Sequence, residues 1–169
     1  MESQLPTFDD VVASLRSPKP ALACRVIELE RGMEKRSAKV IFDGQSGWFI
    51  EDEERVEFRS TDDRVLLDEG GVLRSLRGAY SNGWVKTPFQ GSRMPLEGST
   101  GRVLGREEVD GRPAIVAEFT GLRNGEDTVF RFHVDVESGV ALKMSREDMG
   151  VVLRVEALRV AKVEDPFGA

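Results

Sequence analysis

The sequence predicts a mainly β protein: an antiparallel sheet meander, with a short N-terminal helix and a mid-chain loop over the apolar face of the sheet. Three observations lead to this fold class. Asp-Gly and Asn-Gly pairs separate short apolar runs, and such pairs supply the positive φ angles of two-residue hairpin turns. The runs alternate apolar and polar residues with period two, which is typical of a sheet with one solvated side. A helical pattern is found only at the N-terminal end.

The first predicted element is a helix that begins after Thr7. Thr7 can cap it, because Asp10 lies three residues later and the two can exchange hydrogen bonds. Pro18 and Pro20 end it, because proline interrupts the hydrogen bonding of a helix. One face carries apolar residues at helical spacing, namely Val11, Val12 and Leu15. A helix this short must pack against other elements to be stable.

Strands and turns are predicted for the chain after Pro20. The expected turn pairs are Asp43-Gly44, Asp62-Asp63, Gly70-Gly71, Asp110-Gly111, Asn124-Gly125, Ser138-Gly139 and Met149-Gly150. The expected strands are 21–29, 39–42, 56–59, 64–67, 72–74, 102–109, 113–119, 128–136, 140–144 and 151–160. Turns at this spacing are typical of an antiparallel meander.

Alternation in the second half of the chain predicts which residues share a face. The expected apolar face carries Phe130, Phe132, Val134, Val136, Val140, Leu142, Met144, Val151, Leu153 and Val155. The expected solvated face carries Arg131, His133, Asp135, Glu137, Ala141, Lys143, Ser145, Val152, Arg154 and Glu156. Such a sheet cannot bury its apolar side alone, so it must curl, pair with a second sheet, or be covered by the helix.

Residues 78–101 form the long irregular segment of the sequence. They contain five glycines and two prolines and have no sustained period, so they predict a loop. Long connections are more often lids or binding loops than spacers. The apolar residues of the loop are Trp84, Phe89, Met94 and Leu96, which predict that it folds over the apolar face. A crossover that plugs the end of a barrel is the alternative.

Composition limits the function. The chain has 169 residues, which suit one domain spanning 1–169, and a formal net charge of −6. An acidic chain without a basic stripe is a poor candidate for binding nucleic acid. The single Cys24 and single His133 exclude a disulfide framework and a zinc finger. Cys24 lies in an apolar run and is expected to be a small buried hydrophobe.

The N-terminal residues allow an expectation about the cellular compartment. The N-terminus lacks the basic start and apolar run of a secretory signal. The chain as given therefore predicts a cytoplasmic protein, and an exported one if a leader has been removed. Since about 18 consecutive apolar residues occur nowhere, no integral membrane association is expected.

Catalytic and metal-binding motifs are not found. The sequence contains no G-x-S-x-G, no P-loop and no H-E-x-x-H. One strand face aligns His133, Asp135 and Glu137, but no second histidine completes a metal shell, so a solvated face is the preferred interpretation. The acidic residues near a hairpin, Asp62, Asp63, Asp68 and Glu69, lack the order of a calcium loop and are interpreted as turn chemistry. We therefore expect no metal, no cofactor and no enzymatic activity.

Two segments carry a resemblance to a known family. The first is the hairpin Gly105-Arg106-Glu107-Glu108-Val109-Asp110-Gly111-Arg112-Pro113-Ala114, and the second is Val134-Asp135-Val136-Glu137-Ser138-Gly139-Val140-Ala141-Leu142. With the order of the other features, they resemble the lipoprotein-carrier superfamily, the LolA/LolB-like and RseB/MucB-like half-barrels. The resemblance implies a strongly curved half-barrel whose concave face holds acyl chains or a partner's hydrophobic segment. Members are typically exported.

The predicted function is non-catalytic binding of a lipid, a lipoprotein acyl chain or another apolar ligand on the concave face. The expected apolar lining is Trp48, Ile50, Val56, Phe58, Phe119, Phe130 and Phe132, and the expected lid is Trp84, Phe89, Met94 and Leu96. Ordinary core packing is the alternative for each. A second hypothesis is a protein-interaction or sensor module whose loop 78–101 binds a partner segment. An enzyme using acidic residues of the open face is the third. In all cases a monomer or weak dimer is expected.

Overall fold

The computed structural model describes residues 4–42, 48–51, 56–60, 64–69, 72–77, 83–89, 100–123 and 125–160. Side chains are described within 4–42, 101–121 and 125–160 and at residues 84, 85 and 87–89. The elements are α1 (Phe8–Arg16), β1 (Leu22–Glu30), β2 (Met33–Phe42), β3 (Trp48–Glu51), β4 (Val56–Ser60), β5 (Arg64–Glu69), β6 (Val72–Arg77), α2 (Gly83–Lys86), the 3-10 turn η1 (Thr87–Phe89), β7 (Thr100–Val109), β8 (Arg112–Arg123), β9 (Glu126–Asp135), β10 (Ala141–Arg146) and β11 (Gly150–Val160).

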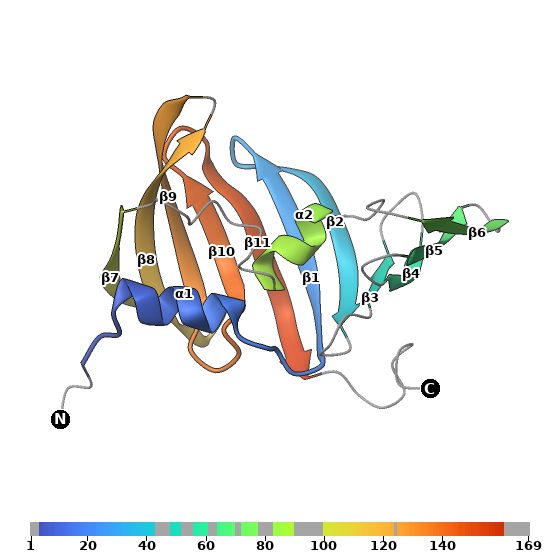
Figure 1. Cartoon of the computed structure of the whole chain (residues 1–169), viewed down its shortest axis with the longest axis horizontal. Coiled ribbons are helices and arrows are strands. Elements are labelled where there is room, and N and C mark those ends of the chain that lie inside the picture. Colours follow the sequence, from blue (N-terminus) through green and yellow to red (C-terminus); the bar gives the residue numbers. More distant parts are fainter. Residues whose placement is uncertain are drawn as a thin grey trace.

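The strands form one antiparallel sheet in the order β6-β5-β4-β3-β2-β1-β11-β10-β9-β8-β7. Neighbours in the sheet are neighbours in sequence except at one place, where β11 pairs with β1 and joins two meanders. The described strands do not close the sheet, because β6 and β7 lie at its two edges. The mainly β half-barrel predicted from the sequence is therefore confirmed. Figure 1 shows α1 and α2 on the same side of the sheet, which we call the inner face.

The helix α1 is confirmed with the predicted cap. The Asp10 backbone N–H donates to the Thr7 hydroxyl (3.1 Å), and the Thr7 N–H donates to the Asp10 carboxylate (3.0 Å). Hydrogen bonding of the Asp10 carboxylate to the backbone and side chain of Thr7 lowers the pKa of Asp10. Val11 and Leu15 are buried against the inner face of β8 and β9. The burial that this packing provides stabilises a helix too short to persist alone.

The C-terminal end of α1 is satisfied by Lys19. Its ammonium donates to the backbone carbonyls of Ser14 (2.8 Å), Leu15 (3.1 Å) and Ser17 (2.8 Å), at the end of the helix where the last carbonyls lack the usual amide donors of a further turn. Burial lowers the pKa of Lys19 to about 8, because loss of water disfavours the charged form. A cation at this end of a helix also complements its dipole.

Two hairpin turns, between β7 and β8 and between β1 and β2, each contain two consecutive residues with positive φ. Asp110 (φ 49°) and Gly111 (φ 76°) both have positive φ and join β7 to β8, as the Asp-Gly pair predicts. Arg31 (φ 51°) and Gly32 (φ 80°) join β1 to β2 in the same way. The second hairpin was not predicted, because arginine is not a residue that favours the first position of such a turn.

The predicted solvated face of β9 is wrong at two residues. His133 is only 4% exposed and Asp135 is fully buried. Asp135 forms an ion pair with Arg112 of the neighbouring strand β8, and His133 forms a hydrogen bond with Glu107 of β7, two strands away. The long side chains of Glu107 and Arg112 cover the polar residues of β9. The alternation of polar and apolar residues cannot reveal such burial, because it depends on residues of other strands.

Register shifts overturn the predicted alternation in β10 and β11. Val140, Ala141 and Leu142 are all buried, since the register shifts between Ala141 and Lys143. Val136, expected on the apolar face, is 58% exposed because β9 has ended before it. A β-bulge inserts an extra residue and turns the following side chains to the other face.

Within the predicted loop 78–101, the described residues 83–89 lie on the inner face and are not irregular. They form α2 and η1, which the sequence did not predict, and β7 begins at Thr100. Val85 and Phe89 are buried in the core formed with β1, β2, β10 and β11. Met94 and Leu96 lie outside the described residues. Within the described part of the chain, no helix has the length and apolar content needed to cross a membrane.

Candidate functional site

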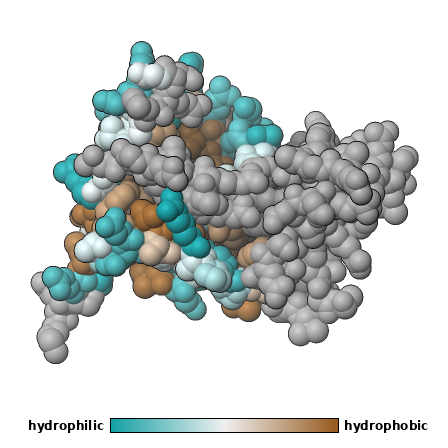
Figure 2. All heavy atoms as spheres, in the orientation of Figure 1, coloured by the Kyte–Doolittle hydropathy of each residue, from teal (hydrophilic) through white to brown (hydrophobic). Residues whose placement is uncertain are grey.

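A pocket of about 480 Å³ lies on the inner face between the two halves of the sheet. Its apolar floor is a row of cross-strand neighbours: Phe132 of β9 pairs with Met144 of β10, which pairs with Leu153 of β11. Cross-strand partners point to the same side of a sheet. Figure 2 shows apolar side chains gathered in the half of the molecule that contains α1.

One end of the pocket is aromatic. The rings of Phe119 and Phe130 stack with centroids 5.0 Å apart and an interplanar angle of 10°. Phe132 lies beside Phe119 at 5.3 Å, and Phe8 of α1 reaches both Phe119 and Phe132. Phe8 can do so because a glycine lies beneath it, and a Cβ at Gly101 would overlap the Phe8 ring. The aromatic end is thus held in place from α1.

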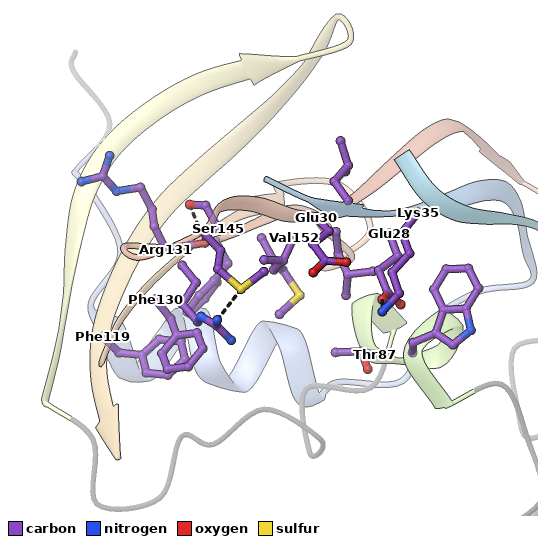
Figure 3. Close-up of a pocket in the computed structure, with 16 residues that line it drawn as sticks. Glu28, Glu30, Lys35, Thr87, Phe119, Phe130, Arg131, Ser145 and Val152 are labelled. Atoms are coloured by element: carbon purple, nitrogen blue, oxygen red, sulfur yellow. Dashed lines mark hydrogen bonds and ion pairs between the residues drawn. The ribbon is translucent and has the colours of Figure 1, made fainter. Parts of the chain in front are cut away.

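The other end of the pocket is polar. Figure 3 shows Glu28, Lys35 and Thr87 there, away from Phe119 and Phe130. Glu28 is ion-paired with Arg36 (2.7 Å) and Lys35 (3.4 Å). The Arg36 guanidinium lies over the Trp84 ring at 4.4 Å, a cation–π arrangement that joins β2 to α2.

A β-bulge decides which valine of β11 contacts the pocket. Leu153 pairs with Met144, whereas Val151 pairs with Ser145, so Val152 is the extra residue. Val152 lines the pocket, and Val151 lines a different surface hollow together with His133 and Lys143. This reverses the predicted faces of the two valines.

Four of the residues predicted from the sequence line this pocket: Trp84, Phe119, Phe130 and Phe132. Phe89 is buried in the core and does not line it. The predicted residues Trp48, Ile50, Val56 and Phe58 belong to β3 and β4, but their side chains lie outside the described residues. The lining residues not named as site residues include Arg146, Met149 and Val152. Met144 and Leu153 could have been found from the alternation, whereas the bulge that brings in Val152 could not.

The outer face carries two buried polar pairs that have structural roles. The His133 Nε2 lies 2.7 Å from a Glu107 carboxylate oxygen, and this hydrogen bond lowers the pKa of Glu107. Arg112 binds both carboxylate oxygens of Asp135, at 3.0 and 2.9 Å. This last pair joins the two sequence segments that carried the family resemblance.

The cysteine and the acidic clusters give no sign of a reactive site among the described residues. Burial raises the pKa of the Cys24 thiol, as expected for a small buried hydrophobe rather than a nucleophile. Among the described residues, no group of three histidine, cysteine or acidic side chains is placed to hold a metal ion. Asp62 and Asp63 lie outside the described residues.

Comparison of the structure with known structures identifies the fold. LprF from Mycobacterium bovis superimposes with a TM-score of 0.53 at 14% identity, covering 95% of this chain and 94% of LprF. The Mycobacterium tuberculosis lipoprotein LppX gives 0.53 at 12% identity, covering 93% of this chain and 100% of LppX. MucB, crystallised in complex with MucA(peri), gives 0.52 at 15% identity, covering 93% of this chain. The aligned region is 55% of the MucB chain.

These likenesses show that the chain has a lipoprotein-carrier-like fold, as the sequence resemblance implies. No protein-family model matches the sequence, and no curated protein has a matching sequence.

Proposed function

We propose that this protein is a non-catalytic binding protein for a lipid, an acyl chain or another apolar ligand held on the inner face of its half-barrel. The observation that carries the proposal is the pocket of about 480 Å³ with an aromatic and aliphatic floor and a charged rim. Its size falls within the roughly 300–1,000 Å³ typical of small-molecule sites. Two methionines, Met144 and Met149, line it, and their flexible side chains adapt to ligands of different shape.

The fold supports the same proposal. LppX, which shares it, is a lipoprotein, which also supports an exported location for this chain. MucB is complexed with MucA(peri), so this fold also accommodates a protein partner. A hydrophobic segment of a partner protein, bound beside Trp84 of the covering segment, is accordingly the second candidate ligand.

Val152 and Val151 provide a matched pair of variants for testing the proposal. Val152→Glu places a carboxylate in the apolar pocket, and its desolvation disfavours an apolar ligand. We expect the affinity for a fluorescent fatty-acid probe to fall by about tenfold or more, which corresponds to about 1.4 kcal/mol. Val151→Glu introduces the same charge one residue away, on the other side of the sheet, and is expected to leave the affinity within about twofold.

The readout is a fluorescence titration of both variants, after circular dichroism has shown equal folding. Phe132 is less suitable, because its side chain is only 1% exposed and a charge there would unfold the protein. Equal affinity in both variants, or no binding by the unmodified protein, would contradict the proposed pocket.

A further inference from the structure

The pocket contains a cation at its aromatic end. Arg146 of β10 is the direct cross-strand neighbour of Phe130 of β9 and faces the same side of the sheet. Its side chain is only 10% exposed. Burying a guanidinium costs free energy unless charged or polar groups compensate it, so its place in an apolar pocket requires an explanation.

The charge of Arg146 is compensated by a nearby carboxylate that lies at the protein surface. The Arg146 Nε and one terminal nitrogen donate to the carboxylate of Asp148, at 2.5 and 3.0 Å, and the same terminal nitrogen contacts the sulfur of Met149. Asp148 is 61% exposed and does not line the pocket, whereas Arg146 does. The carboxylate of Asp148 is engaged through both oxygens but stays solvated, so the carboxylate or phosphate of a ligand can compete for the same guanidinium with similar geometry.

The other cations of the lining are placed differently. Lys35 is ion-paired with Glu28 at the polar end. Arg131 pairs with Glu118 at 2.9 Å, and Figure 3 shows its side chain directed away from Phe119 and Phe130. Of the three described cations that line the pocket, Arg146 alone lies on the inner face at the aromatic end with its partner exposed.

Burial increases inward from Arg146. Phe130, the cross-strand partner of Arg146, is partly exposed. Met144 lies two residues before Arg146 on the same strand, and its cross-strand partners Phe132 and Leu153 are both buried. A pocket with a cation at one end and a buried apolar row beside it is complementary to a molecule with an anionic head and an apolar tail.

We propose that the ligand is an anionic single-chain amphiphile, whose carboxylate or phosphate head pairs with Arg146 and whose tail lies along Phe132, Met144 and Leu153. The inference rests on the proposed apolar pocket and adds the charge and orientation of the ligand. A planar guanidinium binds both oxygens of such a head group. The head group would displace the carboxylate of Asp148, while the tail replaces water over the floor.

The test compares oleate with oleyl alcohol, which has the same chain and no charge, by isothermal titration. The unmodified protein is expected to bind oleate about tenfold more tightly than the alcohol, since a charge-assisted hydrogen bond contributes roughly that factor. Arg146→Gln should remove this preference and leave the affinity for the alcohol within about twofold. Arg131→Gln, which removes a cation directed elsewhere, should retain the preference.

Asp148→Asn distinguishes a role of Arg146 in binding from a role in folding, because this variant is expected to bind oleate more tightly, whereas Arg146→Gln is expected to bind it more weakly. Removing the competing carboxylate should raise the affinity for oleate by about threefold, whereas a purely structural Arg146–Asp148 pair would give no gain. Equal affinities of the unmodified protein for oleate and the alcohol, or an unchanged preference in Arg146→Gln, would overturn the anionic head group and leave the apolar pocket standing. Binding of neither compound would overturn the pocket itself.

Discussion

Replacing Arg112 by methionine should lower the free energy of unfolding by about 3–5 kcal/mol, the cost of leaving a buried charge without its partner. Asp135 is fully buried and receives two hydrogen bonds from Arg112, one from the Ser138 backbone N–H (3.0 Å) and one from the Ser138 hydroxyl (2.5 Å). Methionine keeps much of the arginine stem but offers no donor. The measurement is urea unfolding at neutral pH.

Arg102→Met is the control for this prediction. Arg102 also pairs with a carboxylate, Glu118 at 3.1 Å, but its side chain is 72% exposed and Glu118 retains Arg131. The loss there should stay below about 1 kcal/mol. A similar small loss in both variants would show that the Arg112–Asp135 pair does not organise this end of the sheet.

The same pair predicts how stability depends on pH. Burial raises the pKa of Asp135, but the hydrogen bonds from Arg112 and Ser138 outweigh it and hold the pKa below its ordinary value. The carboxylate therefore contributes stability that is complete above the unfolded value of about 3.9. This contribution is lost as the pH falls through the lower pKa of the folded state.

Replacing Gly139 by alanine should cost about 2–4 kcal/mol, through backbone strain and a steric clash together. Gly139 has φ of +74°, and a Cβ there would lie 2.7 Å from the Ser14 carbonyl oxygen and 2.9 Å from its hydroxyl. The turn between β9 and β10 is thus pressed against the C-terminal end of α1. The substitution should push α1 away from the sheet, and thermal unfolding measures the cost.

Gly111→Ala separates the two contributions. Gly111 has nearly the same φ, +76°, but a Cβ there has nothing within 4 Å. It should show only the strain of a left-handed alanine, about 1–2 kcal/mol. If the two alanine variants unfold at the same temperature, α1 does not pack against the β9–β10 turn as described.

The parts of the fold that depend on local chemistry could be predicted from the sequence. The capping of α1 by Thr7, the hairpin at Asp110 and Gly111, and the burial of Cys24 each follow from residue types at short range. The pairing of β1 with β11 joins distant segments, and no local pattern encodes it.

The pocket could be predicted only in part. A β-bulge changes which side chains face it, and pairs of polar side chains change which residues are buried, and neither is visible in the alternation of the sequence. The pattern identified Phe119, Phe130 and Phe132, but the register shift before Ser145 moved Val152 into the pocket. The burial of His133 depends on Glu107, which lies 26 positions earlier in the sequence. Arg146 follows Met144 by two positions, so continued alternation puts it on the apolar face, but the low exposure of its side chain beside Phe130 is seen only in the structure.

The methionine methyl groups test the central claim most directly. Met144 and Met149 line the pocket, whereas Met33 lies at the tip of the β1–β2 hairpin and is exposed. With ¹³C-labelled methionine methyl groups, titration with oleate should shift the resonances of Met144 and Met149 saturably and leave that of Met33 unchanged. Shifts at Met33 alone, or no saturable shift at Met144 and Met149, would contradict ligand binding on the inner face.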